Sequence, residues 1–177
     1  MAQTPLVHFI HGKESGPRGR KIIALAEVAR GLGYAVESLD YSGTMDPGRR
    51  LEMLLQACAA LEAPLVLVGS SMGGWVAAEA ATRIEVAGVF LLAPALFMPS
   101  YPSQQPVPIR AALEIVHGWG DDVIPVDHSI RFAQAARCAL HLLDADHRLN
   151  DCIPTLEGLF RQFLERLQEQ VAAGGRA

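Results

Sequence analysis

The chain has 177 residues, of which 50% are hydrophobic, and it carries a formal net charge of −4 at pH 7. This length and composition fit one sizeable core, so we expect a single domain over residues 1–177. The acidic balance argues against a dominant nucleic-acid or anionic-membrane partner, because such partners require basic surface. No apolar run reaches the roughly 18 residues that a membrane span requires.

The start of the chain and its cysteines limit the cellular context. An apolar run begins at Leu6, without the basic start and long apolar stretch of a signal peptide, so we expect a cytoplasmic protein.

The three cysteines, Cys58, Cys138 and Cys152, are far apart and lack CxxC spacing. We therefore expect neither a disulfide framework nor a zinc site, and we interpret these cysteines as buried small hydrophobic residues.

Six short, largely apolar runs predict β-strands. In chain order they cover residues 6–10, 35–41, 64–69, 86–93, 112–118 and 139–143. Most of them lack alternation of polar and apolar residues, which is typical of strands that are covered on both faces. Such strands occur in parallel sheets whose crossover connections are helices.

Helical periodicity fills the intervals between these runs. Residues 20–32, 49–61 and about 154–172 each place apolar side chains on one stripe of a helix. The basic residues around the start of the first helix, Arg18, Arg20 and Lys21, are expected to form a solvated first turn. The alternation predicts a doubly wound α/β sandwich of three layers, in which ligands bind at the carboxyl ends of the strands.

A G-x-S-x-G pattern follows the third predicted strand. It reads Gly69-Ser70-Ser71-Met72-Gly73 and is followed by helix-forming residues. In this strand-turn-helix context the middle serine sits on a tight turn as an exposed nucleophile. The alternative is a Gly/Ser turn that caps a helix, with either serine binding a first-turn N–H. The flanking strand and helix favour Ser71 as a nucleophile.

A serine nucleophile requires a base and an acid, which in this architecture follow it in the order Ser, Asp or Glu, His. Asp121 follows the fifth predicted strand and His147 follows the sixth, so both satisfy this order. Asp122 is an alternative acid, although it can instead cap the helix that starts near Pro125. The reserve candidates, Asp144 and Asp146, lie in the same loop as His147.

The other histidines have structural explanations. His8 and His141 lie inside strands and are expected to be packed or paired in the core. His8 and His11 would point to opposite faces of a strand, so they cannot share a metal ion. His117 is expected to order the loop of the acid, and His128 begins the next helix.

Two backbone N–H groups are expected to bind the oxyanion of the reaction. The N–H of Met72 follows the nucleophile at the positive end of a helix. The second donor in this architecture comes from the loop after the first central strand, where Gly12 permits a close approach and the N–H of Lys13 is the best candidate.

These motifs together resemble the α/β-hydrolase superfamily, particularly its small lidless esterases, over essentially the whole chain. The resemblance implies a sheet ordered 2-1-3-4-5-6 with the nucleophile after the third strand, and it implies neither metal nor cofactor. Many members insert a lid between strands four and five, but this chain has only a short Pro-rich loop over residues 95–110.

The predicted function is hydrolysis of a small carboxylic ester or thioester through an acyl-Ser71 intermediate. Trp75 and Trp119 are expected to line the substrate site, although each could equally belong to the core. The alternative is a non-catalytic interaction module on the same scaffold. Neither an oligomeric state nor a physiological substrate follows from the sequence.

Overall fold

The sheet of this computed structural model has the predicted topology. The structure describes residues 3–103 and 109–174, and the six strands in these ranges pair in parallel in the order β2-β1-β3-β4-β5-β6. Their bounds are β1 (Leu6–Ile10), β2 (Ala35–Ser38), β3 (Leu65–Ser70), β4 (Gly88–Leu92), β5 (Ala112–Gly118) and β6 (Ala139–Leu143). The predicted sheet order is therefore confirmed, although β2 and β4 are shorter than expected.

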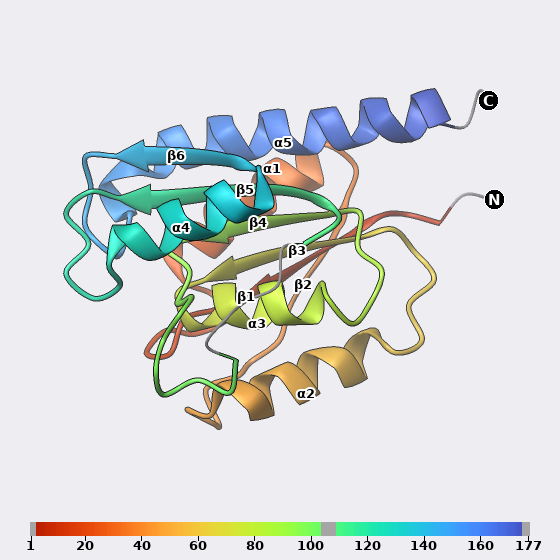
Figure 1. Ribbon diagram of the computed structural model, residues 1–177. Coiled ribbons are helices and arrows are strands. Elements are labelled where there is room, and N and C mark those ends of the chain that lie inside the picture. Colours follow the sequence, from red (N-terminus) through yellow and green to blue (C-terminus); the bar gives the residue numbers. More distant parts are fainter. Residues whose placement is uncertain (1–2, 104–108, 175–177) are drawn as a thin grey trace.

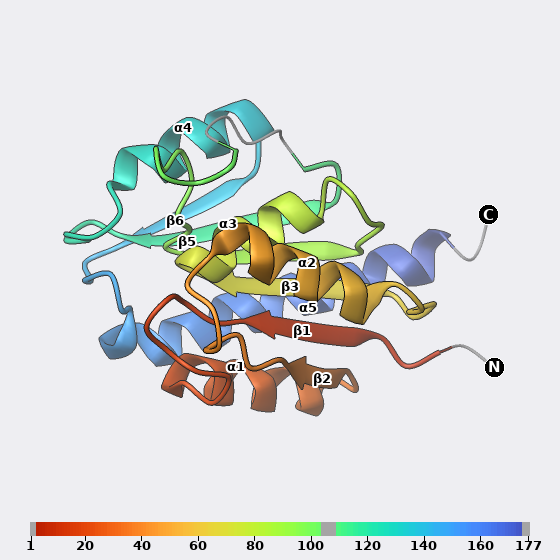
Figure 2. The ribbon, with the colours of Figure 1, turned by 90° about the horizontal axis from the view of Figure 1, so that it is seen from below.

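Helices cover both faces of the sheet, so the predicted three layers are present (Figures 1 and 2). One face carries α1 (Arg20–Gly31) and α5 (Ile153–Gly174), which pack against each other. The other face carries α2 (Pro47–Cys58), α3 (Met72–Ala80) and α4 (Val126–Ala136). A short 3-10 helix, η1 (Asn150–Cys152), leads into α5.

The burial of β3 explains why its sequence is apolar without alternation. Leu65 and Leu67 belong to the core beneath α2, α3 and α4, whereas Val66 and Val68 belong to the core beneath α1 and α5. Successive side chains of a strand point to opposite faces, so a strand between two helical layers needs apolar residues at every position.

The start of α2 lies two residues before its predicted start. Asp46 caps the helix by accepting a hydrogen bond from the N–H of Arg49 at 2.6 Å, and Pro47 occupies the first helical turn. This cap brings Arg50 into the first turn, where its side chain is buried. The position of Arg50 bears on the active site described below.

Three sequence-based expectations concern features outside the sheet. Cys58 is buried, but Cys138 and Cys152 are only half-buried because they lie beside the exposed edge strand and the start of α5, so the expected burial is wrong for these two. Within the described ranges, no helix combines the length and apolar character needed to cross a membrane. The Pro-rich loop over residues 95–110 lies partly outside the described residues.

Candidate active site

Ser71 occupies the sharp turn between β3 and α3. Its backbone has φ 54° and ψ −118°, a conformation that is strained for a residue other than glycine. The turn is held by the end of β4, because the Ser71 N–H donates to the carbonyl of Leu92 and its carbonyl accepts from the N–H of Ala95, both at 2.9 Å. The Ser71 side chain makes no capping bond to α3, so its hydroxyl remains free for another partner.

The glycines of the turn are required by space. A Cβ atom on Gly69 would lie 2.2 Å from the carbonyl oxygen of Gly73, and one on Gly73 would lie 2.0 Å from the carbonyl oxygen of Ile10. Both distances are far inside van der Waals contact. The motif therefore allows α3 to start directly against the ends of β1 and β3.

A continuous chain of hydrogen bonds joins Ser71, His147 and Asp121. Nε2 of His147 lies 3.0 Å from Oγ of Ser71, and Nδ1 of His147 lies 2.7 Å from Oδ2 of Asp121. Because a carboxylate only accepts hydrogen bonds, Nδ1 carries the proton of the neutral imidazole, which leaves Nε2 to accept from the serine hydroxyl. The structure thus brings together Ser71, His147 and the favoured acid, Asp121.

Asp121 is a buried carboxylate that accepts three hydrogen bonds and has a fourth N–H close by. Its Oδ1 accepts from the N–H groups of Val123 at 2.9 Å and Ile124 at 2.8 Å, and its Oδ2 lies 2.9 Å from Nε2 of His117 as well as beside His147. Burial by itself would raise the pKa of Asp121, but the bonds from Ile124, His147 and Val123 outweigh it and hold the pKa below its usual value. The group is thereby kept ionised.

The alternative acids occupy other positions. Asp122 is exposed and does not cap α4, whose N-cap residue is Pro125. Asp144 is exposed as well. Asp146 shapes the loop that carries His147, because its Oδ1 accepts from the N–H groups that follow, of Arg148 at 2.9 Å and Leu149 at 3.1 Å.

Lys21 connects α1 to the same loop. Its Nζ donates to the carbonyl of Arg148 at 2.6 Å, immediately after His147 in the chain. Burial lowers the pKa of Lys21 to about 8, although the nearby Asp146 and Asp121 act to raise it. The expectation that Lys21 lies in a solvated first turn is therefore wrong. Its tertiary contact could not be recognised from the sequence, because its partner is a backbone carbonyl.

The two expected oxyanion donors lie on segments that meet at Ser71. In the described part of the chain, neither the N–H of Met72 nor that of Lys13 donates to a protein acceptor. The loop that carries Lys13 approaches the nucleophile closely, since a Cβ on Gly12 would be 3.4 Å from Cβ of Ser71. Both N–H groups thus remain available to a ligand beside Ser71.

The two tryptophans differ in exposure. Trp75 is 1% exposed; its ring packs edge-on against Tyr101, with centroids 5.4 Å apart, and its Nε1 donates to the carbonyl of Ser103 at 3.3 Å. The structure gives Trp75 no surface with which to contact a substrate, because its position in α3 faces the core. Trp119 is 58% exposed and Val123 is 56% exposed, and these two residues flank Asp121 in the chain.

The remaining histidines have protein partners. Nε2 of His8 lies 3.2 Å from the Tyr41 hydroxyl in the core, and Nε2 of His141 lies 2.9 Å from Oε2 of Glu114. His128 lies edge-on to a neighbouring phenylalanine ring. Within the described residues, no group of three or more His, Cys, Asp or Glu side chains is arranged to hold a metal ion.

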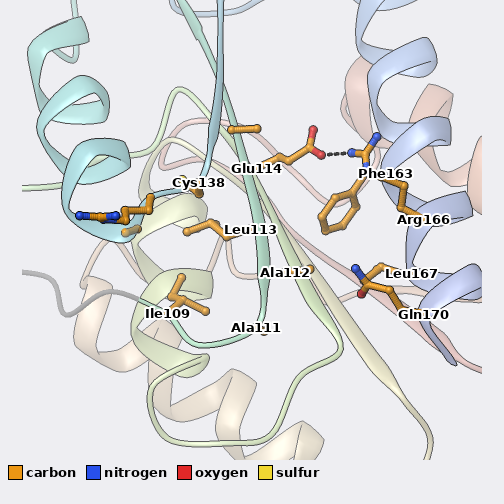
Figure 3. A pocket seen from close by; sticks show the side chains of 13 residues that line it. Ile109, Ala111, Ala112, Leu113, Glu114, Cys138, Phe163, Arg166, Leu167 and Gln170 are labelled. Atoms are coloured by element: carbon orange, nitrogen blue, oxygen red, sulfur yellow. Dashed lines mark hydrogen bonds and ion pairs between the residues drawn. The ribbon is translucent and has the colours of Figure 1, made fainter. Parts of the chain in front are cut away.

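A separate cavity of about 310 Å³ lies at the other end of β5 (Figure 3). Ala112 and Leu113, at the start of this strand, line it together with Glu114, Phe163 and Arg166, whereas Asp121 follows the end of the strand. Figure 3 shows the Arg166 guanidinium paired with the Glu114 carboxylate. This cavity is therefore distinct from the site around Ser71.

Known structures with the same fold support assigning the chain to the α/β-hydrolase superfamily. A protein from Xanthomonas campestris pv. campestris, assigned to the α/β-hydrolase superfamily, is 32% identical with a TM-score of 0.85; the match covers 92% of this chain and 99% of that one. Alpha/beta hydrolase domain-containing protein 10 from mouse has a TM-score of 0.81 at 22% identity, with 94% and 92% of the two chains covered. At that identity, the mouse structure shows the shared fold alone.

Curated sequences give a more distant relationship. Bovine palmitoyl-protein thioesterase ABHD10, a mitochondrial protein, is 25% identical in an alignment 188 residues long that covers 74% of this chain. The chain spans 61% of the length of this relative. A model of the uncharacterised protein family UPF0227 matches residues 6–105, which contain the G-x-S-x-G turn and the loop of Lys13. From these matches and its fold, the chain belongs to the uncharacterised protein family UPF0227 and to the α/β-hydrolase superfamily.

Proposed function

We propose that this protein is a serine hydrolase that cleaves small carboxylic esters or thioesters, with Ser71 as nucleophile, His147 as base and Asp121 as acid. The observation that carries the proposal is the unbroken hydrogen-bond chain from the buried Asp121 carboxylate through His147 to the Ser71 hydroxyl. A serine hydroxyl is a weak nucleophile until such an imidazole takes its proton. The strained turn holds this serine with its Oγ within hydrogen-bond distance of His147.

Acylation follows from this geometry. Oγ of Ser71 attacks the carbonyl carbon of the substrate while its proton passes to Nε2 of His147. The carbonyl oxygen becomes an oxyanion, which the N–H groups of Met72 and Lys13 stabilise. The tetrahedral intermediate then expels the alkoxide or thiolate, which takes the proton from His147. Asp121 stabilises the transient imidazolium without itself becoming protonated.

Deacylation repeats these steps with water. Nε2 of His147 accepts a proton from water, whose oxygen attacks the acyl carbon of acyl-Ser71. The second tetrahedral intermediate releases the carboxylic acid, and Ser71 regains its proton from His147. No cofactor is needed for either half of the reaction, because each proton is moved by the imidazole.

An apolar rim beside the site supports binding of the acyl group. Trp119 and Val123 are among the few large apolar side chains exposed in the described residues, and both flank Asp121. Burying an exposed apolar surface against an acyl chain contributes about 25 cal/mol per Å². We therefore propose Trp119 and Val123, in place of the buried Trp75, as substrate contacts. The thioesterase name of the ABHD10 relatives supports including thioesters among the substrates.

A panel of p-nitrophenyl esters and acyl-CoA thioesters of graded acyl length tests the proposal. We expect turnover with an initial burst of leaving group equivalent to the enzyme, because acyl-Ser71 accumulates when deacylation is slower. Ser71→Ala should abolish the burst and reduce kcat by at least about 10³-fold. Ser70→Ala removes the adjacent hydroxyl and is the matched control.

Two results would contradict the proposal as a whole, and a third would contradict its nucleophile. One is Ser71→Ala turning over every substrate of the panel at the rate of the wild type. The other is a folded wild-type protein that shows neither burst nor turnover on any ester or thioester, as the alternative of a non-catalytic interaction module requires. Equal loss of activity in Ser70→Ala and Ser71→Ala would also contradict the assignment of the nucleophile.

A further inference from the structure

Arg50 is a fully buried arginine on α2 whose side chain reaches the loop of Lys13. Its Nη1 donates to the carbonyl oxygens of His11 at 3.1 Å and Gly12 at 3.0 Å, and its Nη2 donates to that of Lys13 at 3.3 Å. Its Nε donates to the carbonyl of Thr44 at 2.9 Å. The guanidinium, 0% exposed, thus holds three successive carbonyls of one loop.

The partners of Arg50 are unusual for a buried charge. Among the described residues no carboxylate forms an ion pair with it; besides the carbonyls, the Tyr41 ring lies 5.9 Å away. Burying a cation is costly unless hydrogen bonds satisfy it, and the guanidinium has a rigid fork of donors that can hold several oxygens at once. The Arg50 guanidinium therefore binds mainly to backbone carbonyls of the loop of Lys13.

The Gly12 carbonyl has a second strong donor. The Tyr41 N–H donates to Nε2 of His11 at 2.9 Å, so in the neutral ring Nδ1 carries the proton and donates to the Gly12 oxygen at 2.8 Å. Burial lowers the pKa of His11, which keeps the ring neutral. The Gly12 carbonyl is thus fixed by both Arg50 and His11.

The fixed carbonyl belongs to the same peptide unit as the Lys13 N–H. In a planar trans peptide the C=O and N–H bonds point in opposite directions, so holding the Gly12 oxygen fixes the direction of the Lys13 hydrogen away from Arg50. A cation on the oxygen also polarises the peptide and makes its N–H a stronger donor. The loop lies against Ser71, where a Cβ on Gly12 would touch Cβ of Ser71 at 3.4 Å.

We propose that Arg50 is a positioning residue of the oxyanion site: it holds and polarises the Gly12–Lys13 peptide so that the Lys13 N–H stabilises the oxyanion formed at Ser71. This proposal rests on the proposed function. It assigns to α2 a part in transition-state binding without contact between Arg50 and the substrate. The effect of losing Arg50 should therefore fall on kcat rather than on KM.

The test compares Arg50→Met, Arg50→Lys and wild type with one p-nitrophenyl ester. Arg50→Met should lower kcat about 10²-fold, within the range found for loss of one oxyanion donor, and change KM less than about threefold. Arg50→Lys keeps the cation but lacks the rigid fork of donors, so it should recover about tenfold of that loss and stay about tenfold below the wild type. The inhibition constant of a trifluoromethyl ketone, whose adduct with serine places an oxyanion in this site, should rise in proportion to the loss of kcat/KM.

Two control variants separate this role from general damage. Arg49→Met removes the neighbouring positive charge on α2, where the Arg49 side chain is exposed and pairs with Glu52. Leu54→Val removes core packing on the same helix, about one turn after Arg50. Both controls should keep the wild-type kcat, and Leu54→Val should show a reduced melting temperature.

The outcomes distinguish this inference from the proposed function. A wild-type protein that is not labelled on Ser71 by a fluorophosphonate overturns both. A labelled wild type with folded Arg50→Met or Arg50→Lys variants that keep kcat and the ketone affinity overturns the inference alone. If Arg50→Met does not fold, Arg50→Lys decides, since an unchanged ketone affinity in that variant contradicts the inference. A loss of kcat in Arg49→Met equal to that in Arg50→Met would also overturn it.

Discussion

The Nε2–H of His117 lies between two acceptors, the carbonyl of Ile124 at 3.1 Å and Oδ2 of Asp121 at 2.9 Å, and this same Oδ2 accepts from His147 at 2.7 Å. Nδ1 of His117 lies 2.7 Å from Oγ of Ser129, so the neutral ring accepts the serine proton there. Burial lowers the pKa of His117, which keeps it a neutral donor. Asp121 is thus held between two histidines with different tasks.

We predict that His117→Leu slows the enzyme because it removes the N–H that lies beside the ionised acid and is shared between Asp121 and the Ile124 carbonyl. A bond to a charged group contributes about 1.5–3 kcal/mol, so kcat should fall by roughly 10- to 100-fold if the whole effect falls on the transition state. Steady-state kinetics with one ester measures this loss. Ser129→Ala leaves the Nε2–H in place and should retain most of kcat. Wild-type kcat in a folded His117→Leu variant would show that His117 has no influence on Asp121.

Substitution by alanine should change the stability of the protein in opposite directions at two glycines, Gly73 and Gly158. Gly73→Ala places a Cβ 2.0 Å from the Ile10 carbonyl oxygen and should cost at least about 2 kcal/mol of unfolding free energy or prevent folding. Gly158, within α5, has no atom within 4 Å of such a Cβ, so Gly158→Ala should stabilise the protein by about 0.5–1 kcal/mol. Urea unfolding measures both changes. Equal effects of the two substitutions would contradict the close approach of α3 to β1.

Acid should destabilise the protein through His8. Burial lowers the pKa of His8 from 6.5 to about 4, even though Glu37 lies 3.6 Å from its Nδ1, because that carboxylate is exposed and screened by water. The unfolded chain therefore binds the proton more readily. The contribution of neutral His8 to the free energy of unfolding is fully present above pH 6.5 and is lost as the pH falls toward 4. This loss amounts to up to about 3 kcal/mol.

Urea unfolding at pH 7 and at pH 5 measures this dependence. His8→Gln has no titrating group and keeps a polar partner for the Tyr41 hydroxyl, so it should lose less stability between the two pH values than the wild type. The buried His11 and His117 have lowered pKa values and contribute in the same direction, so part of the loss should remain. An identical loss in wild type and His8→Gln would exclude His8 as a source.

The sequence allowed the sheet and the group formed by Ser71, Asp121 and His147 to be predicted for a physical reason. Strands buried on both faces are apolar at every position, and the ends of parallel strands converge on one edge of the sheet. Loops that follow β3, β5 and β6 therefore meet, whatever their separation in the chain. The order along these loops pointed to Ser71 and His147 and favoured Asp121, but it left Asp122 open as an alternative acid, and the structure brings Asp121 to His147.

The roles of Arg50, Lys21 and Trp75 could not be predicted in this way. Arg50 and Lys21 donate to backbone carbonyls, which every residue carries and which leave no pattern in the sequence. Trp75 follows the G-x-S-x-G motif, and the sequence does not show whether its side chain faces the core or the site. The packing of Trp75 against Tyr101 shows that it faces the core. Partners that lack a side-chain signature require the three-dimensional structure.

The most direct measurement is covalent labelling of the protein with a fluorophosphonate, followed by mass spectrometry of its peptides. We predict a single label on Ser71, lost in Ser71→Ala and much slower in His147→Ala, because attack on phosphorus needs the imidazole to take the serine proton. Asp121→Asn should slow the reaction by about 10⁴-fold, since the imidazole then loses its orienting carboxylate. A folded wild-type protein that takes up no label, or one labelled at a residue other than Ser71, would contradict the account.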